Sequence, residues 1–517
     1  MTTEQAIRVG ILPLRNQVPV PGAGLAVSFD RARSLEVLKA LATEDDPQVA
    51  LFVQHDQTVD QPGPEDVYPH GVLARASEIA AAGTTFAGLS RVRLESWADD
   101  GAALMGEVVV LGDDGEAAGT ELVAELRKTA RQLVEAMPEL PRDLLAVIDM
   151  IPPRRLAYEV GAYMSASVEN KIGLLLAESE RQCVETGLSL LKQQLRLEQR
   201  LQTLAGAEMK DCWCLQKGAE AEIDRREKSG ELSAEEAEDV RSFRRRGYVV
   251  FEKLVEDELI DALLSDLRSI ADRPGEFLTT DHRRGRGFRL SGADFDAYES
   301  VFDLYVNFES SRRVCFHPRI LRFLEIIFDA RPLAFQQLLF QRSNLHPLHQ
   351  DTAYVCVQEP LLLAATWVAL EDVVPGRGEL TYFEGSHRIP HHIFESGGKR
   401  YHSERDDEGT AREHIVRQCE EMACEQKDFF AKKGDVFLWA ADLVHGSRSR
   451  TRPEHETRLS CVTHYCPETT EPVWFWSQPK HKTIERYGDR ALIASSQYLL
   501  PRSPDRDRPH TRAPLPS

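Results

Sequence analysis

A histidine and an aspartate stand one residue apart in "PLHQDTAYVCVQEP", residues 347 to 360. The run is typical of a strand, in which residues i and i+2 project to the same face. We therefore predict that His349 and Asp351 reach one metal ion with an imidazole nitrogen and a carboxylate oxygen. About one His-x-Asp is expected by chance in a chain with 16 histidines, so its meaning depends on residues elsewhere.

Two further residues, His445 and Arg458, could complete a metal site together with His349 and Asp351. In the stretch 432 to 465, a turn at Gly434, a strand "VFLW" and a second apolar segment lead to His445, and Arg458 begins the predicted strand "TRLSCVTHY". Two histidines and a carboxylate leave about three positions of an octahedral iron open, which suits a bidentate 2-oxo acid and dioxygen. An arginine fork can bind the far carboxylate of such an acid. We assign this role to Arg458 because it enters a strand, although the same stretch also offers Arg448, Arg450 and Arg452.

Composition indicates a globular protein with more than one domain. The 517 residues exceed the usual single-core size of roughly 250 to 300 residues. A formal charge of -20 argues against nucleic-acid or anionic-membrane binding, because both need a basic face. The 9 cysteines are odd in number and scattered, unlike a secreted disulfide framework, and no apolar run approaches the ~20 residues that span a bilayer. We expect a cytoplasmic protein with no nucleic-acid or membrane partner, and the oligomeric state stays open.

Hydrophobic patterning divides the chain into four parts and predicts a multidomain α+β fold. Residues 8–205 carry short apolar runs separated by turns to about residue 120, which predict a β module, and then the helical spacing of a bundle. The polar, charge-rich residues 206–237 have the composition of a linker. Residues 238–485 form the second predicted domain, and 486–517 a tail that we expect to be disordered at its Pro- and Arg-rich end.

The first half resembles the N-terminal substrate-binding domain of the Lon proteases. The resemblance is carried by "ILPLRNQVPVPGAGLAVSF", "VALFVQHDQTVDQPGPEDVYPHGVLARASEI" and "GLSRVRLESW". It implies a PUA-like β module with a helical extension that helps to recognise protein substrates. The phosphate-binding motif of an ATPase is absent from the sequence: "SGGKRY" (396–401) lacks both the first glycine spacing and the hydroxyl residue after Lys399. The chain is therefore not expected to be a Lon protease.

The second half resembles the phytanoyl-CoA dioxygenase (PhyH) family of Fe(II)/2-oxoglutarate oxygenases. The matching stretches are "FRRRGYVVFEKLVEDELIDALLSDL", "LHQDTAYV", "ATWVALEDVVPGRGELTYFEGSHR" and "KKGDVFLWAADLVHGS". The resemblance implies a double-stranded β-helix, a jelly-roll or cupin-like domain with flanking helices. It also implies Fe(II) bound by His349, Asp351 and His445, the distal carboxylate of 2-oxoglutarate on Arg458, and a co-substrate pocket lined by Ser447 and Trp367.

By this resemblance the protein hydroxylates a substrate with 2-oxoglutarate and O2 and releases succinate and CO2. Retention of Asp351 favours hydroxylation, because related halogenases replace that carboxylate with a small residue. The substrate is either a protein or peptide recruited by the Lon-like half, or a small molecule with that half as a scaffold. Residues 391–428 are predicted to cover the mouth of the site. The alternative from another class is a non-catalytic adaptor with a Lon-like recognition domain and a degenerate jelly roll.

Overall fold

The computed structural model divides the chain into two compact units, Met1–Arg200 and Leu201–Pro516. Among the described residues, no helix is both long enough and apolar enough to cross a bilayer. The residues that the structure describes are 6–15, 17–27, 29, 31–55, 59, 61–79, 83–99, 103–112, 115–137, 140, 142–164, 168–205, 209–273, 277–281, 285–289, 300–341, 346–403, 405–451, 457–477 and 482–497.

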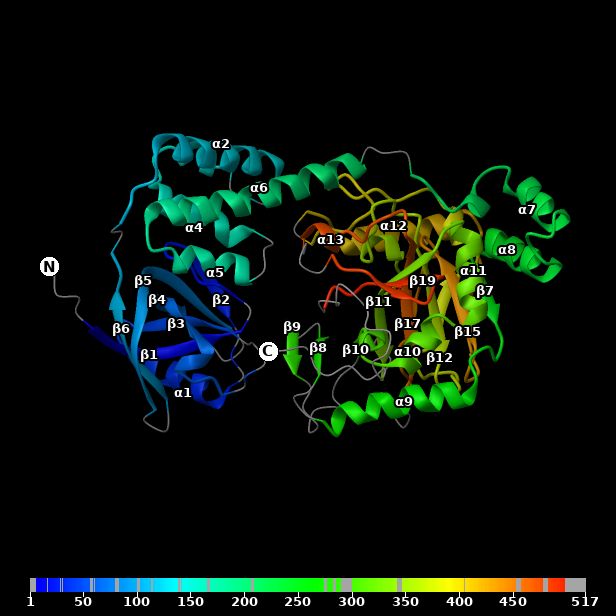
Figure 1. Ribbon diagram of the computed structural model, residues 1–517, viewed down its shortest axis with the longest axis horizontal. Helices are drawn as coiled ribbons and strands as arrows, with labels where there is room; N and C mark the ends of the chain where they lie inside the picture. Colours follow the sequence, from blue (N-terminus) through cyan, green and yellow to red (C-terminus); the bar gives the residue numbers. More distant parts are fainter. Residues whose placement is uncertain are drawn as a thin grey trace. The chain divides into compact units, whose positions relative to one another are not determined.

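A closed β barrel forms the first part of unit 1 (Figure 1). β1 pairs in parallel with β3 and antiparallel with β6, and β6 also pairs with β5, so the path through β5, β4, β3, β1 and β6 returns to its start. β2 pairs with the first residues of β5, ahead of the part of β5 that pairs with β6. The strands are β1 (Ala6–Leu14), β2 (Gly24–Val27), β3 (Gln48–Gln54), β4 (Val67–Glu78), β5 (Thr84–Asp99) and β6 (Leu104–Val110). α1 (Ala32–Leu41) packs Val37, Leu38 and Leu41 into the barrel core.

The helices of unit 1 bury a second apolar core. Their apolar residues recur at helical spacing, as in Leu126, Ala130 and Leu133 of α2 and Leu188 and Leu191 of α6, so one side of each helix is buried. The helical bundle that the spacing predicted between 121 and 205 is confirmed. These helices are α2 (Thr120–Ala136), α3 (Leu144–Val147), α4 (Pro153–Tyr163), α5 (Val168–Leu176) and α6 (Glu180–Ala205).

Unit 2 begins with helices where we predicted a polar linker, residues 206–237. α7 (Ala219–Lys228) and α8 (Ala234–Arg246) follow a short 3-10 turn, and a capping box between Ser233 and Glu236 starts α8. Cys214, Ile223 and Phe243 are buried in the largest core of the unit. Residues 209–237 therefore belong to the folded second unit, and their charges cover the exposed sides of short helices.

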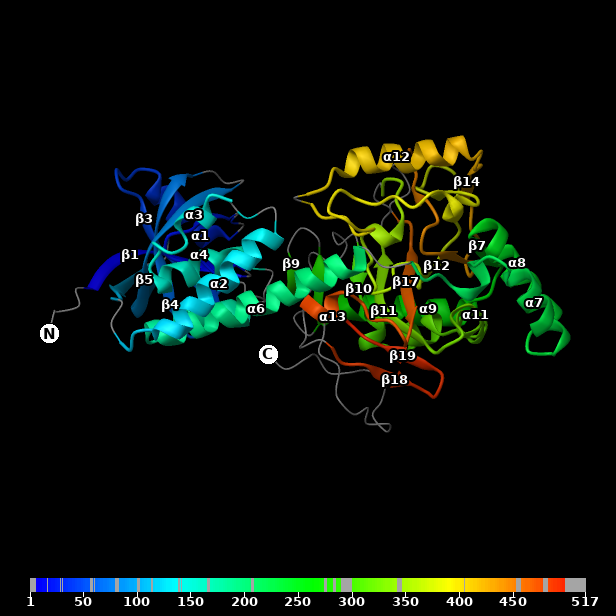
Figure 2. The same cartoon turned by 90° about the horizontal axis from the view of Figure 1, so that it is seen from above.

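Two sheets and a separate strand pair build most of the rest of unit 2 (Figure 2). The large sheet runs β18-β19-β11-β17-β12-β15-β7, with β10 also paired to β11, and the small sheet runs β14-β13-β16. The large sheet contains β7 (Tyr248–Phe251), β10 (Ser300–Phe302), β11 (Pro332–Phe340), β12 (Ala364–Ala369), β15 (Val436–Ala440), β17 (Ser460–Pro467), β18 (Glu485–Tyr487) and β19 (Ala491–Ile493). The small sheet contains β13 (Leu380–Phe383), β14 (Gln426–Phe429) and β16 (His445–Ser447). β8 (Leu278–Asp281) and β9 (Gly285–Arg289) pair only with each other.

Strand alternation gives the large sheet two different apolar faces. One face, with Val368, Leu438 and Tyr465, packs in one core with α9 (Asp257–Ala271), α10 (Glu309–Cys315) and α11 (Pro318–Phe328). The opposite face, with Trp367 and Trp439, packs against the small sheet. The predicted jelly-roll type of fold with flanking helices is confirmed.

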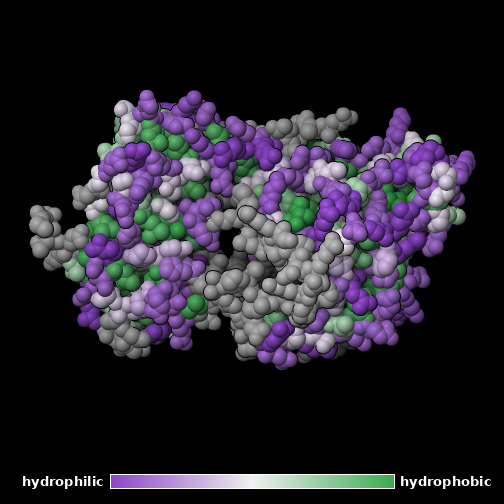
Figure 3. Space-filling view, viewed as in Figure 1, coloured by the Kyte–Doolittle hydropathy of each residue, from purple (hydrophilic) through white to green (hydrophobic). Residues whose placement is uncertain are grey.

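The remaining elements of unit 2 are two helices and the last strand pair. α12 (Glu408–Glu421) lies between β13 and β14 in the chain, and α13 (Trp474–Ser477) follows β17. β19 pairs in parallel with β11, so the first part of the segment predicted as a tail completes the large sheet. Residues 498–517, the end of that segment, lie outside the described residues. In the view of Figure 3, hydrophobic residues form small separate areas among hydrophilic ones.

Candidate metal centre

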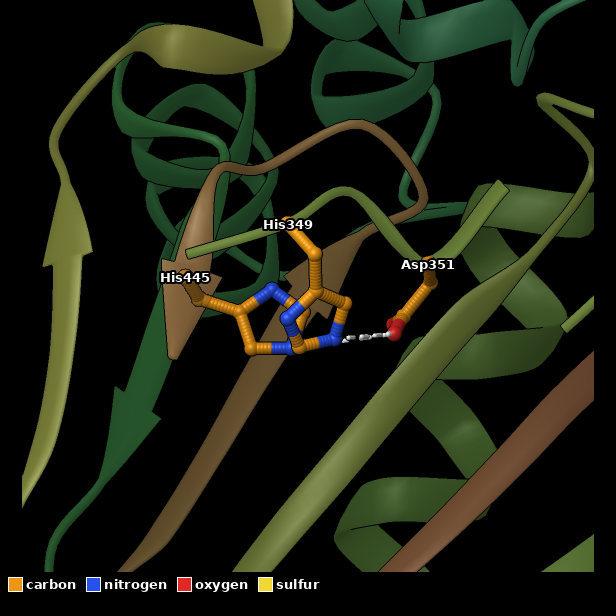
Figure 4. Close-up of side chains that lie close together, drawn as sticks. All are labelled: His349, Asp351 and His445. Carbon is orange, nitrogen blue, oxygen red and sulfur yellow. Dashed lines mark ion pairs between the residues drawn. The ribbon is translucent and has the colours of Figure 1, made fainter. Parts of the chain in front are cut away.

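His349 and Asp351, which are close in the sequence, converge with the distant His445 in unit 2 (Figure 4). One potential ligand atom from each of His349, Asp351 and His445 lies within 4.8 Å of the other two. Nε2 of His349 and Nε2 of His445 are each 3.6 Å from Oδ1 of Asp351. Asp351 and His445 are buried, whereas His349 is partly exposed, so the set is open on the side of His349.

Main-chain hydrogen bonds place the two histidines opposite each other. The amide of His349 donates to the carbonyl of His445 at 2.9 Å, and the amide of His445 donates back at 3.0 Å. The predicted strand through His349 and Asp351 is wrong, because His349 forms only this isolated bridge and Asp351 begins a 3-10 turn, Asp351–Ala353. The two side chains meet because the chain turns immediately after the bridge, and same-face alternation along a strand plays no part.

The backbone also sets which nitrogen of each imidazole is available. Nδ1 of His349 lies 2.8 Å from the carbonyl oxygen of Pro347, and Nδ1 of His445 lies 2.9 Å from that of Leu443. A carbonyl oxygen only accepts hydrogen bonds, so each Nδ1 carries the proton and donates it. In the neutral rings the lone pair is then on Nε2, which faces Asp351. This is the arrangement in which histidine ligates a metal, with its second nitrogen held by a hydrogen bond.

Contacts to the second carboxylate oxygen, Oδ2, orient the side chain of Asp351. The indole Nε1 of Trp439 donates to Oδ2 of Asp351 at 2.8 Å, and Nε2 of His464 lies 3.8 Å from the same oxygen. Oδ1 is left facing the two histidines. Burial alone raises the pKa of Asp351, but the neighbouring His445, His349 and His464 outweigh it and hold the pKa well below its usual range. Burial lowers the pKa of His445 to about 4, so this imidazole is neutral at pH 7, as a metal ligand must be.

A cavity of about 390 Å³ opens beside the three side chains. Its volume lies in the range of small-molecule binding sites. The wall is mostly apolar, with a few polar groups directed inward. The side chains that line it include Phe302, Gln336, Leu338, Phe340, His346, Tyr354, Val355, Trp367, Leu380, Glu408, Trp439, Val462 and His464.

Arg458 brings a buried positive charge to this cavity. Its side chain lines the wall and only 4% of the residue is exposed. Within the described part of the chain its guanidinium makes no ion pair, and its buried Nε has no hydrogen-bond partner. The ring centres of Trp367 and Phe340 lie 5.7 Å and 6.0 Å from the guanidinium carbon. Burial lowers the pKa of Arg458 to about 10, so it remains a cation at pH 7 and can receive a carboxylate.

The other two predicted pocket residues border the same cavity. Ser447 lies at the end of β16 and accepts a hydrogen bond from the amide of His346 at 2.8 Å. Trp367 projects from the middle of β12 and is 2% exposed. All six residues singled out from the sequence thus border one space. Among the alternative arginines, Arg448 is exposed and paired with Asp428 at 2.8 Å, which removes it from the pocket, and Arg452 lies outside the described residues.

Sequence reasoning missed other groups of the site. Trp439 shares the face of β15 that carries Phe437, so alternation in "VFLW" could have identified it. Tyr354 and Glu408 line the cavity and are joined by a hydrogen bond of 2.6 Å from the phenol to the carboxylate. Glu408 is the first residue of α12, so the segment 391–428 reaches the cavity, and no local sequence signal pointed to this residue.

Two different protein families match the two halves of the chain. Residues 8–193 match the family model "ATP-dependent protease La (LON) substrate-binding domain", and residues 243–453 match "Phytanoyl-CoA dioxygenase (PhyH)". Both resemblances inferred from the sequence are confirmed at the level of these families.

The chain is similar to different proteins in its two halves. It is 28% identical over 211 residues to Lon protease 2 of Myxococcus xanthus, a match that covers 38% of this chain and 25% of the relative. It is 24% identical over 236 residues to the peroxisomal phytanoyl-CoA dioxygenase of Homo sapiens, covering 42% of this chain and 65% of that protein. The chain therefore spans a quarter of its Lon relative and less than two thirds of its dioxygenase relative.

Two solved structures are similar to the separate halves. The non-heme alpha ketoglutarate dependent epimerase SnoN from nogalamycin biosynthesis aligns at a TM-score of 0.38 and 19% identity, over 51% of this chain and 99% of that one. The N-terminal domain of the Mycobacterium avium complex Lon protease aligns at 0.30 and 18% identity, over 36% of this chain and 98% of that one.

Proposed function

We propose that unit 2 is an Fe(II)- and 2-oxoglutarate-dependent dioxygenase that hydroxylates a substrate and releases succinate and CO2. The observation that carries the proposal is the convergence of His349, Asp351 and His445 beside a cavity that also contains the buried cation of Arg458. A metal-binding triad alone fits many reactions. The pairing with a buried cation that makes no ion pair within the described residues points to a co-substrate with a carboxylate.

The donor set fits a ferrous ion. Two neutral imidazole nitrogens and one carboxylate oxygen form the two-histidine, one-carboxylate group of non-heme Fe(II) sites. Each histidine is held by its own main chain, and the carboxylate is held by Trp439, so little reorganisation is needed on binding. When bound, the iron supplies the redox chemistry that joins 2-oxoglutarate and O2 to oxidation of a substrate C–H bond.

The protein's own groups bind and orient the co-substrate. Arg458 receives the distal carboxylate of 2-oxoglutarate, and its fork supplies two parallel charge-assisted hydrogen bonds. Trp367 and Phe340 form apolar walls beside that guanidinium and exclude water from the ion pair. Ser447 lines the same wall beside His445 and offers a hydroxyl to the bound acid. The remaining space, towards Tyr354 and Glu408, is left for the substrate.

A spectroscopic titration tests this assignment without knowledge of the substrate. Under anaerobic conditions, Fe(II) and 2-oxoglutarate together should give a visible charge-transfer band that neither gives alone, and Asp351→Ala should abolish it. Admission of O2 should then release succinate. An iron-loaded protein that shows neither the band nor 2-oxoglutarate turnover would exclude the enzyme and favour the non-catalytic adaptor.

We further propose that unit 1 recruits a polypeptide to the oxygenase. The support is the match of residues 8–193 to a substrate-binding domain family. The full chain, supplied with Fe(II), 2-oxoglutarate and a mixture of unfolded peptides, should retain a subset of them and add one oxygen atom to that subset. If no peptide is retained or oxidised while 2-oxoglutarate is consumed, unit 1 is a scaffold and the substrate is a small molecule.

A further inference from the structure

The metal-binding loop, residues 346–355, is held by main-chain hydrogen bonds at His346, His349 and Ala353 and by side-chain bonds between them. It carries two of the three proposed ligands, yet His349 is its single bridge residue. Two of its side-chain hydrogen bonds, from the residues on either side of Asp351, converge on Asp442. The side chain of Gln350 donates to the carbonyl of Asp442 at 2.8 Å, and Thr352 donates to Oδ1 of Asp442 at 2.7 Å.

Asp442 also lies close in sequence to the third ligand. It stands in the turn between β15 and β16, just ahead of His445, the first residue of β16. Gln350 lies between the other two ligands, and Thr352 directly follows Asp351. The buried Asp442 therefore connects the two chain segments that supply the ligands, through its carboxylate to Thr352 and through its main-chain carbonyl to Gln350. A shift of Asp442 would change the position of the loop relative to His445.

The second oxygen of Asp442 is bound by a buried lysine from a third segment. Nζ of Lys399 lies 2.5 Å from Oδ2, and the side chains of the two residues are 1% and 4% exposed. Nδ1 of His391 lies 3.1 Å from the same oxygen. Asp211 lies near this pair, and burial raises the pKa of its carboxyl to about 6. Lys399 is the lysine of "SGGKRY", which the sequence excluded as a nucleotide-binding motif and left without a role.

A fully buried ion pair contributes little to the stability of a fold. Removing both charges from water costs several kcal/mol per ion, and apolar residues of similar volume are often as stable or more so. Such a pair instead fixes geometry, because the carboxylate oxygens can be satisfied in only one arrangement. Here that arrangement joins the loop with His349 and Asp351, the turn before His445, and residues 391–399.

We propose that Lys399 and Asp442 are a positioning pair that holds the metal-binding loop in its ligating geometry and attaches residues 391–399 to it. The inference rests on the proposed function, since it concerns the same three ligands. Groups that orient ligands without touching the metal typically change its affinity by about 10- to 100-fold. Lys399→Met keeps most of the side-chain volume and removes the charge, so it should weaken metal binding by that factor.

Binding of Co(II), a spectroscopic substitute for Fe(II), measures this directly on the full chain. The affinity is obtained from the visible absorption of the bound ion, and thermal melting of the metal-free protein reports stability separately. Thr352→Val is the second variant. It leaves the ion pair in place and removes one hydrogen bond of about 1 kcal/mol, which corresponds to an affinity loss of roughly fivefold. Lys432→Met is the matched control, because Lys432 forms an exposed pair with Asp372 at 3.0 Å.

The Co(II) affinities distinguish the positioning role of Lys399 and Asp442 from the proposed function itself. Weaker Co(II) binding in Lys399→Met and Thr352→Val, with Lys432→Met unchanged, supports the positioning role. If Lys399→Met does not fold, Thr352→Val alone decides. Variants that are folded and bind Co(II) as tightly as wild type, even if they melt earlier, overturn the inference and leave the proposed function standing. A wild-type chain that binds no Co(II) overturns both.

Discussion

Arg458 provides the sharpest test of the co-substrate site, because the structure predicts opposite effects on binding and on stability. Arg458→Met removes the charge and keeps an apolar chain beside Trp367 and Phe340. Hydrogen bonds between charged groups contribute about 1.5 to 3 kcal/mol each, and part of this is lost to imperfect geometry. A net loss of about 2 to 3 kcal/mol corresponds to a roughly 30- to 150-fold higher Kd for 2-oxoglutarate.

Stability should change in the other direction. Arg458 is 4% exposed, and its buried Nε has no partner within the described residues, so the free protein carries an incompletely compensated charge. Replacing a buried ion by an apolar side chain is often neutral or stabilising. The metal-free Arg458→Met protein should therefore melt at the wild-type temperature or above it. A residue that served only the fold would show a lower melting temperature.

The assay is an anaerobic titration of the iron-loaded protein with 2-oxoglutarate, followed by the visible band. Arg458→Lys keeps the charge and loses the fork, so its Kd should lie between those of wild type and Arg458→Met. Arg448→Met is the control, since Arg448 is exposed and pairs with Asp428. If Arg458→Met changes the Kd by less than about threefold, or Arg448→Met changes it as much, the assignment of the distal carboxylate to Arg458 is wrong.

Three further predictions concern other contacts of unit 2. Trp439→Phe removes the 2.8 Å hydrogen bond to Asp351 and should weaken Co(II) binding about tenfold while melting changes little; equal affinity would show that Asp351 needs no orienting partner. Gly446→Ala should lower both metal affinity and melting temperature, because a Cβ there would lie 2.6 Å from the carbonyl oxygen of His346; a crystal structure with the loop unmoved would refute this. Burial raises the pKa of Asp303 from 3.8 to about 7, so the native state keeps a proton that the unfolded chain loses. Its effect on stability should become less favourable as pH rises from about 4 to 7, and in melting curves Asp303→Asn should remove this part of the pH dependence.

The sequence predicted the site residues better than it predicted why they meet. His349, Asp351, His445 and Arg458 were identified by type, spacing and resemblance, although Arg458 lies two residues before β17 and not within the strand predicted for it. Alternation failed for His349 and Asp351. The isolated bridge to His445 depends on a partner about a hundred residues away, which no local pattern encodes.

The linker and the tail were misread for a related reason. In α7 and α8 the charged residues outnumber the apolar ones, and ion pairs such as Arg241 with Glu220, Asp224 and Glu227 cover the outer surface. The few apolar residues, Ile223 among them, are nevertheless fully buried. The overall composition of a short helix is dominated by its exposed residues. The few apolar residues on one side, which determine how the helix packs, contribute little to it. β19, at only Ala491–Ile493, is too short to show any period.

The reciprocal amide–carbonyl pair between residues 349 and 445 has a consequence for redesign. These main-chain groups are the same whichever side chain is attached. Replacing either histidine by cysteine, aspartate or glutamate would therefore change the type of metal ligand without moving the two Cα positions apart. This scaffold should accordingly accept new ligand types at those two positions more readily than at residue 351, whose placement depends on an indole.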